Sequence, residues 1–152
     1  MQITDLKTLD LSERQEARSS EAQIAGADDA LGAKASDPAL TGLLHGEVPE
    51  AAGHRDALAE VIAAHGAAPR AHADRTMRAQ ADHLADARDA ALVASAQRVQ
   101  HDEIALHGSL AARAKPLGIR DRSRLEAILA EQKGADARLT GIAEGGVTTE
   151  AA

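Results

Sequence analysis

Several side chains able to bind a metal ion recur at helical spacing along this chain. Spacings of three and four residues keep a set of side chains on one face of a helix. Four segments each place at least one carboxylate on the face that otherwise carries apolar residues. A buried ionised carboxylate is costly unless it is paired or binds a metal. Carboxylates near the middle of all four segments therefore indicate a shared polar centre, and the acids and the histidine on these faces are Glu13, Glu21, Glu47, Glu50, His54, Glu103 and Asp136.

Two pairs of polar residues on these faces lie one helical turn apart. One pair is Glu50 with His54, and the other is Gln132 with Asp136. This spacing is similar to the di-metal centres of helical bundles. There, two helices supply one Glu each and two others supply a carboxylate with a second ligand. The alternative is a thin core whose carboxylates are solvated or salt-bridged, because the chain carries 24 acidic residues and some fall on any stripe. Periodicity alone leaves both interpretations open.

Proline and glycine divide the chain into the elements that would position these residues. Asp37-Pro38 predicts an N-cap followed by proline at the first helical position, and Gly66 predicts a helix stop. A further break is predicted at 115–118. The predicted helices run over about 5–35, 38–65, 73–113 and 121–144, with an interruption near Asp86 as an alternative for the third. Short connections predict that successive helices pack antiparallel.

One residue conflicts with this division. Pro49 lies inside the predicted second helix, where proline is expected to kink or break the helix at a cost of about 3 kcal/mol. The alternative is two shorter helices, the second of which starts at Pro49. At the other end of the chain, Gly145-Gly146 predicts the end of the last helix. We therefore expect one helical domain over 1–146 and a disordered tail over 147–152.

Composition narrows the class of protein. A length of 152 residues suits one domain, and the absence of cysteine excludes disulfides and thiolate zinc sites. The net charge of -7, spread along the chain, argues against nucleic acid as a partner. No apolar run approaches the roughly 20 residues of a membrane span, so no membrane partner is expected. The first residues lack the features of a signal peptide, which predicts a cytoplasmic protein.

The apolar residues predict an unusually thin core. The chain contains no Phe, Tyr or Trp, and alanine supplies most of its apolar residues. Alanine favours helix strongly but buries little area. We therefore expect a helical domain of marginal or partner-dependent stability, and the extreme alternative is a chain that does not fold alone.

Two segments resemble one known family. Segment 88–105, RDAALVASAQRVQHDEIA, looks like the signature helix of the YciE/YciF family, which usually reads RDAALIAAAQ(K/R)VEHYEIA. Segment 125–140, LEAILAEQKGADARLT, resembles the last helix of that family, with EQKGAD in place of the usual EEKxxD. Shorter matches occur at 5–9, 20–23 and 35–38, so the resemblance covers nearly the whole chain.

The resemblance implies an all-α fold, a ferritin-like antiparallel four-helix bundle, in a protein that is usually a homodimer and is linked to stress responses. It also implies a centre of two iron or two manganese ions, acting on a small oxidant such as oxygen or peroxide. Carried over residue by residue, the implied metal ligands are Glu21, Glu50, His54, Glu103 and Asp136.

Three departures from the family pattern bear on that centre. Gln100 and Gln132 stand where the family usually has Glu, and neutral amides are weaker ligands for hard cations. They favour the alternative function, a non-catalytic helical stress or interaction protein that has lost its metal site. His107 replaces a tyrosine. We expect His107 at the surface or in a loosely packed core, and its alternative place is the bundle centre.

Overall fold

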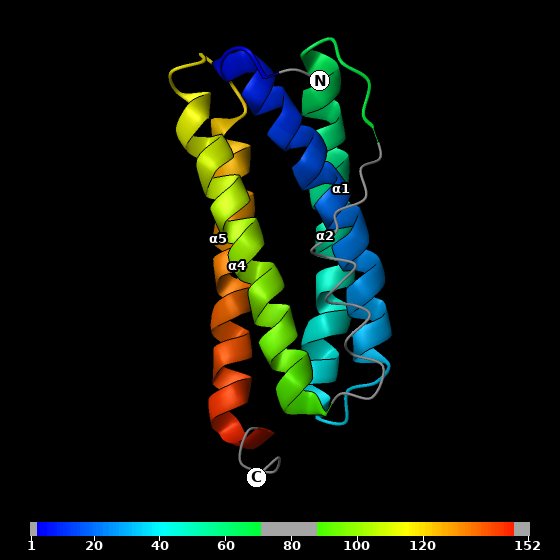
Figure 1. Ribbon diagram of the computed structural model, residues 1–152. Helices are drawn as coiled ribbons and strands as arrows, with labels where there is room; N and C mark the ends of the chain where they lie inside the picture. Colours follow the sequence, from blue (N-terminus) through cyan, green and yellow to red (C-terminus); the bar gives the residue numbers. More distant parts are fainter. Residues whose placement is uncertain (1–2, 71–87, 148–152) are drawn as a thin grey trace.

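The protein is a bundle of long helices. The computed structural model describes residues 3–70 and 88–147, and these ranges contain four α-helices and no strand (Figure 1). The helices are α1 (Leu6–Gly32), α2 (Pro38–Ala64), α4 (Asp89–Ala114) and α5 (Arg122–Ile142), and a short π-helical turn, η1 (Ala143–Val147), follows α5. The predicted all-α class is confirmed.

Local chemistry fixes the helix ends where the sequence predicted them. Helix α2 begins at Pro38, and the Oδ1 atom of its N-cap, Asp37, accepts a hydrogen bond of 2.8 Å from the backbone N–H of Leu40. Beyond its C-terminus, Gly66 has a φ of 74°, which glycine adopts without a steric penalty. Gly118 has a φ of 66° in the turn between α4 and α5. The predicted helix start at Asp37-Pro38, the helix stop at Gly66 and the break at 115–118 are confirmed.

Pro49 does not divide the second helix. Helix α2 is continuous over Pro38–Ala64 with Pro49 inside it, so the prediction of two pieces is wrong. Both Pro49 and His45 are exposed. Because proline has no N–H, the His45 carbonyl loses its helical partner. Water can bond that carbonyl on the exposed face, so the break expected from local chemistry does not occur.

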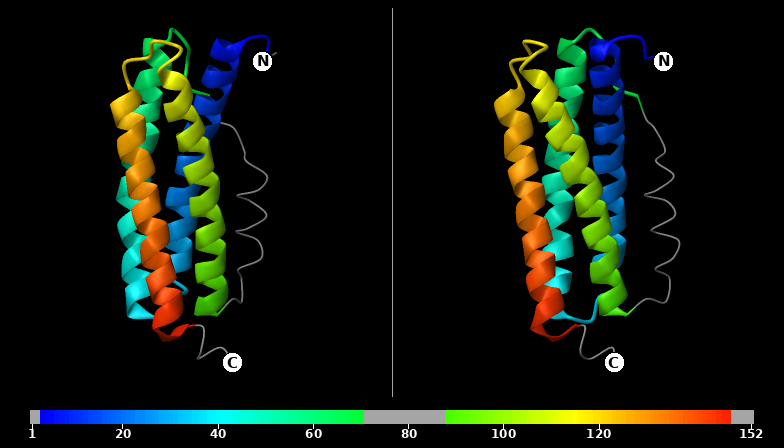
Figure 2. Two further views of the ribbon diagram at one scale, coloured as in Figure 1. Left: turned by 90° about the vertical axis from the view of Figure 1, so that its left-hand side faces the viewer. Right: turned by 60° about the vertical axis from the view of Figure 1, so that its left-hand side comes forward.

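The helices follow a ferritin-like path. Helices α1 and α2 form one antiparallel pair and α4 and α5 another, but α2 and α4 run in the same direction (Figures 1 and 2). The end of α2 and the start of α4 lie at opposite ends of the bundle. At the start of α4, the side chain of Asp89 accepts hydrogen bonds from the backbone N–H groups of Ser36 and Asp37 in the α1–α2 turn. The expectation that all successive helices pack antiparallel is therefore wrong for α2 and α4. Ferritin-like bundles have one such crossover.

The third helix was predicted from residue 73, and in the described residues α4 begins at Asp89, with Arg88 as its extended N-cap. Residues 71–87, including the predicted interruption near Asp86, lie outside the described residues. The predicted tail, 147–152, lies outside them too except for Val147, which closes η1. In the part of the chain that the structure describes, no helix is both long and apolar enough to span a membrane.

The core consists of two main apolar clusters with a polar layer between them. The cluster beside the α1–α2 turn comprises Leu31, Leu40, Leu44, Leu92, Val93, Ala96 and Leu139. The cluster at the other end comprises Ala17, Leu58, Leu110, Ala111, Ala114 and Leu125. Between them the buried side chains include the polar residues Glu21, Asp28, Glu47, His54, Gln100, Glu103, His107 and Gln132. The aliphatic clusters hold the helices together at both ends, so they also fix the position of this polar layer.

Candidate metal centre

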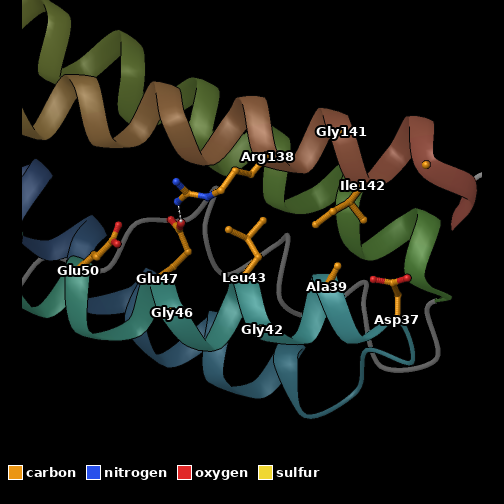
Figure 3. Close-up of a pocket in the computed structure, with 11 residues that line it drawn as sticks. Asp37, Ala39, Gly42, Leu43, Gly46, Glu47, Glu50, Arg138, Gly141 and Ile142 are labelled. Atoms are coloured by element: carbon orange, nitrogen blue, oxygen red, sulfur yellow. Dashed lines mark hydrogen bonds and ion pairs between the residues drawn. The ribbon is translucent and has the colours of Figure 1, made fainter.

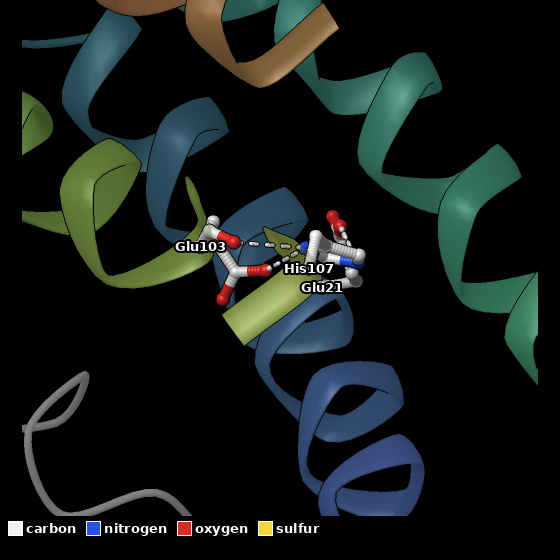
Figure 4. A group of neighbouring side chains, drawn as sticks. All are labelled: Glu21, Glu103 and His107. Atoms are coloured by element: carbon white, nitrogen blue, oxygen red, sulfur yellow. Dashed lines mark hydrogen bonds and ion pairs between the residues drawn. The ribbon is translucent and has the colours of Figure 1, made fainter. Parts of the chain in front are cut away.

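Three buried side chains converge in the polar layer. Glu21 comes from α1, and Glu103 and His107 come from one face of α4 (Figure 4). One ligand-type atom of each residue lies within 4.8 Å of the other two. At most 1% of the surface of each residue is exposed. Two carboxylates and an imidazole at this separation form a group that can surround a metal ion.

Each of these side chains presents one atom without a hydrogen-bond partner among the described residues. The three atoms are Oε2 of Glu21, Oε2 of Glu103 and Nε2 of His107. Buried polar atoms normally have such a partner, because losing the hydrogen bonds to water is costly. The three unpartnered atoms belong to the same cluster, so one ion could satisfy all of them.

The remaining polar atoms of Glu103 and His107 are held by protein groups. The Ser20 hydroxyl donates a hydrogen bond of 2.5 Å to Oε1 of Glu103. Nδ1 of His107 lies 3.1 Å from the Glu103 backbone carbonyl and 3.3 Å from its Oε2. A carbonyl can only accept, so Nδ1 carries the proton in the neutral ring and Nε2 keeps its lone pair. This orientation turns Nε2 toward Glu21, whose Oε1 lies 3.6 Å away.

The electrostatics of the cluster favour a positive charge. Burial raises the pKa of Glu21, and the neighbouring Glu103 charge raises it further, although His54 and His107 lower it. Burial by itself lowers the pKa of His107, but Glu103 and Glu21 outweigh that effect and raise it. Both shifts are expected where carboxylates are buried with too few cations. A metal ion would supply that charge.

His54 and Gln132 complete the surroundings of Glu21. Nδ1 of His54 lies 3.2 Å from Glu21 Oε1, and its Nε2 lies 2.5 Å from Glu131 Oε2. The Gln132 amide donates a hydrogen bond of 3.2 Å to the same Glu21 Oε1. Burial alone would lower the pKa of His54, but hydrogen bonds to and charges on Glu21 and Glu131 raise it to about 9. His54 therefore acts as the cation of this part of the layer at neutral pH.

The structure brings together three of the five residues implied as ligands. Glu21 and Glu103 belong to the cluster and His54 contacts it. Glu50 is exposed and lines a groove of about 730 Å³ between α2 and α5 with Glu47 and Arg138 (Figure 3). Asp136 is half-buried, and its Oδ1 lies 3.6 Å from Nε2 of the exposed His101. Glu50 and Asp136 thus lie outside the cluster, and metal binding by any of the five stays a prediction.

The histidine in the cluster was misplaced by the sequence analysis. His107 is fully buried at the bundle centre, so the expectation of a surface or loosely packed position is wrong. The physical reason is that Glu103 and Glu21 accompany its polar ring, which makes burial tolerable. The signal was its spacing of four residues from Glu103, one helical turn on the same face.

A second group of polar side chains, Glu47, Gln100 and Arg138, lies in the same polar layer beside the cluster. The Gln100 amide donates to Glu47 Oε2 at 3.0 Å, and Arg138 donates to Glu47 Oε1 at 2.8 Å. Burial raises the pKa of Glu47 and the Glu50 charge adds to that effect, while the bond from Arg138 opposes it. Both oxygens of Glu47 therefore have protein partners, whereas Glu21 and Glu103 each have one oxygen without a hydrogen-bond partner.

Fold and site together define a class, the ferritin-like helical bundle with buried carboxylates at its centre. The profile of the family described as "Domain of unknown function (DUF892)" matches residues 11–152. The chain is 45% identical to YciF of Escherichia coli over 67 residues, which are 43% of this chain and 40% of that protein. In that comparison the chain spans about two fifths of the curated relative. The chain belongs to this family, and the resemblance to the YciE/YciF family is confirmed.

Three solved structures share the whole arrangement. The stress protein YciF of E. coli superposes with a TM-score of 0.88 and 26% identity, over 96% of this chain and 99% of that one. YcfI of Rhodopseudomonas palustris gives 0.82 and 29% identity, over 91% and 94% of the two chains. A ferritin-like, diiron-carboxylate protein of Bacillus anthracis gives 0.76, over 89% and 95%, at 16% identity. The last similarity shows the fold alone, and the ferritin-like fold class is confirmed.

Proposed function

We propose that this chain is a cytoplasmic, ferritin-like stress-associated protein that binds iron or manganese at the centre of its bundle and acts on oxygen or peroxide. The observation that supports this proposal best is the set of three unpartnered buried atoms on Glu21, Glu103 and His107. Two carboxylate oxygens and one imidazole nitrogen form a donor set that suits Fe²⁺ and Mn²⁺. When bound, such an ion supplies redox chemistry and open coordination positions for a small oxidant.

The residues of the chain would prepare and protect this site. Ser20 holds the Glu103 carboxylate through Oε1, and Oε2, which has no hydrogen-bond partner, would bind the ion. The backbone bond to His107 Nδ1 sets the ring orientation, as hydrogen bonds behind metal ligands generally do. The apolar clusters above and below exclude water, which strengthens the attraction between the carboxylates and a cation.

The proposal is tested by thermal melts of metal-stripped protein, followed by far-UV circular dichroism with and without Mn²⁺ or, anaerobically, Fe²⁺. An ion that binds only the folded state adds about 2.7 kcal/mol of stability at a hundredfold excess over its Kd. We expect a clear upward shift of Tm that Glu103→Gln or His107→Gln removes and that the control Glu50→Gln keeps. Peroxide consumption by the iron-loaded protein then tests the reaction class. An unchanged Tm would contradict metal binding.

A second candidate function is supported by the amides. Gln132 donates to Glu21 and Gln100 donates to Glu47, so protein groups already satisfy part of the polar layer. In this alternative the carboxylates hold the helices in register, and the protein is a non-catalytic helical stress or interaction protein. It predicts a helical spectrum with no change of Tm on addition of metal.

We also propose a homodimer, the usual state of this family. A core made largely of aliphatic residues and alanine buries little area, so burial of further surface against a second copy would add stability. Light scattering after size-exclusion chromatography should give twice the mass of 15.7 kDa, and a monomeric mass would contradict this part of the proposal.

A further inference from the structure

We infer that the bundle centre of this chain holds one metal ion rather than the pair that a ferritin-like fold implies. The inference rests on the proposed function, because it concerns the number of ions at the same site. It depends on which oxygens are free, which residue types occupy the inward positions, and how His54 is bonded.

A pair of metal ions needs carboxylates that bridge them through both oxygens. Each carboxylate of this cluster has only one oxygen without a hydrogen-bond partner. Glu21 Oε1 is contacted by His54 and by the Gln132 amide, and Glu103 Oε1 by the Ser20 hydroxyl. Oε2 of both residues and Nε2 of His107 have no hydrogen-bond partner among the described residues, and one ligand-type atom of each of the three residues lies within 4.8 Å of the other two. Three donors around one position suit one ion, and no second set of this kind occurs in the described residues.

The inward positions on α2 and α5 lack the carboxylates that a second ion requires. Di-metal helical bundles use a Glu-x-x-His pair, three residues apart, on each of two helices. On α2 the residue three positions before His54 is Ala51, and on α5 the residue three positions after Gln132 is Ala135. Both alanines are buried and face the interior, at 4% and 1% exposure. The acids beside them in sequence, Glu50 and Asp136, lie elsewhere.

His54 is not available as a ligand for a second ion in this geometry. Its Nδ1 faces Glu21 Oε1 at 3.2 Å, and its Nε2 faces Glu131 Oε2 at 2.5 Å. Each ring nitrogen of His54 therefore already faces a carboxylate oxygen in this geometry. The imidazole and the Gln132 amide thus contact the Glu21 oxygen that a second ion would need.

The test is the stoichiometry of Mn²⁺ on metal-free protein, measured by isothermal titration calorimetry and by metal analysis after dialysis. We expect one ion per chain and an electron paramagnetic resonance spectrum of isolated Mn²⁺. Two ions per chain with the spectrum of a spin-coupled pair would overturn the inference. No bound ion would instead contradict the proposed function, so the two failures are distinguishable.

Variants show where the ion binds and why there is only one. Glu47→Gln combined with Glu50→Gln alters the groove between α2 and α5, and we expect binding of one ion to persist. Loss of binding in this variant would place the ion in the groove and overturn the inference. Ala51→Glu combined with Gln132→Glu supplies two inward carboxylates, and after circular dichroism has shown a folded bundle we expect binding of a second ion.

Discussion

Asp28 should make this protein less stable as the pH rises toward 8. The contact between Glu21 and His54 sets the register of α1 against α2, and two turns further along the pair the same register places Asp28 opposite Glu47. Asp28 is 6% exposed. Burial, followed by the charges of Glu47 and Glu21, raises its pKa from 3.8 to about 8. The folded protein therefore keeps a proton there that the unfolded chain releases.

The sign and size of the effect follow from linkage. Between pH 3.8 and about 8 the unfolded state has lost the Asp28 proton and the folded state has not. Stability associated with this group is complete below the lower pKa and decreases as the pH rises. The loss is about 1.4 kcal/mol per pH unit, so by neutral pH it reaches up to about 4 kcal/mol. Asn cannot ionise, and its amide can donate to Glu47, so Asp28→Asn should abolish this loss.

The assay is urea unfolding followed by far-UV circular dichroism from about pH 4 to pH 8, since the chain has no Trp or Tyr for fluorescence. We expect Asp28→Asn to exceed the wild type in free energy of unfolding at pH 7 and to match it near pH 4. The control is Asp29→Asn at the adjacent, exposed position, with a change within about 0.5 kcal/mol at every pH. The reasoning would be refuted if Asp28→Asn and the wild type had the same free energy of unfolding at pH 7. It would also be refuted if their difference in free energy were the same at all pH values.

Two further predictions concern stability and use the same urea assay. Pro49→Ala restores a backbone N–H inside α2 and should raise the free energy of unfolding by about 2 kcal/mol; a decrease would mean that the proline is needed in the helix. Arg14 is fully buried and contacts Asp10 and Asp121 at 2.7 and 2.6 Å, so Arg14→Met leaves the buried Asp10 with only its longer contact to Arg113 and should cost about 3–5 kcal/mol. The control Arg55→Ala removes an exposed pair and should cost under about 1 kcal/mol, and equal costs would contradict the role of burial.

Local sequence signals made the helix ends predictable. The relative directions of the helices were not predictable from such signals. Asp37-Pro38 and Gly66 act through their own backbone geometry, so they mark boundaries whatever surrounds them. The start of α4 at Asp89 is set by long-range contacts, because Asp89 accepts from Ser36 and Asp37 on the α1–α2 turn. Helical periodicity does not reveal this contact, so it does not predict that α2 and α4 run in the same direction.

The site was predictable to within one residue on each helix. Glu21 and Glu103 lie on well-defined faces, and both are buried. On α2 and α5 the predicted inward faces included buried residues such as His54 and Gln132. They also included the exposed Glu50, beside the buried Ala51, and the half-buried Asp136. Alanine occurs on every face of these helices, so hydrophobic periodicity defines the inward direction poorly. Burial of the polar His107 depends on partners from another helix, which periodicity does not reveal.

The most direct test of the metal centre is an anomalous-difference map from crystals of the protein soaked in Mn²⁺. We predict one peak per chain, within bonding distance of the side chains of Glu21, Glu103 and His107, and its loss in crystals of Glu103→Gln. A peak in the groove beside Glu47 and Glu50, or no peak at saturating Mn²⁺, would contradict the claim that these three side chains form a metal centre.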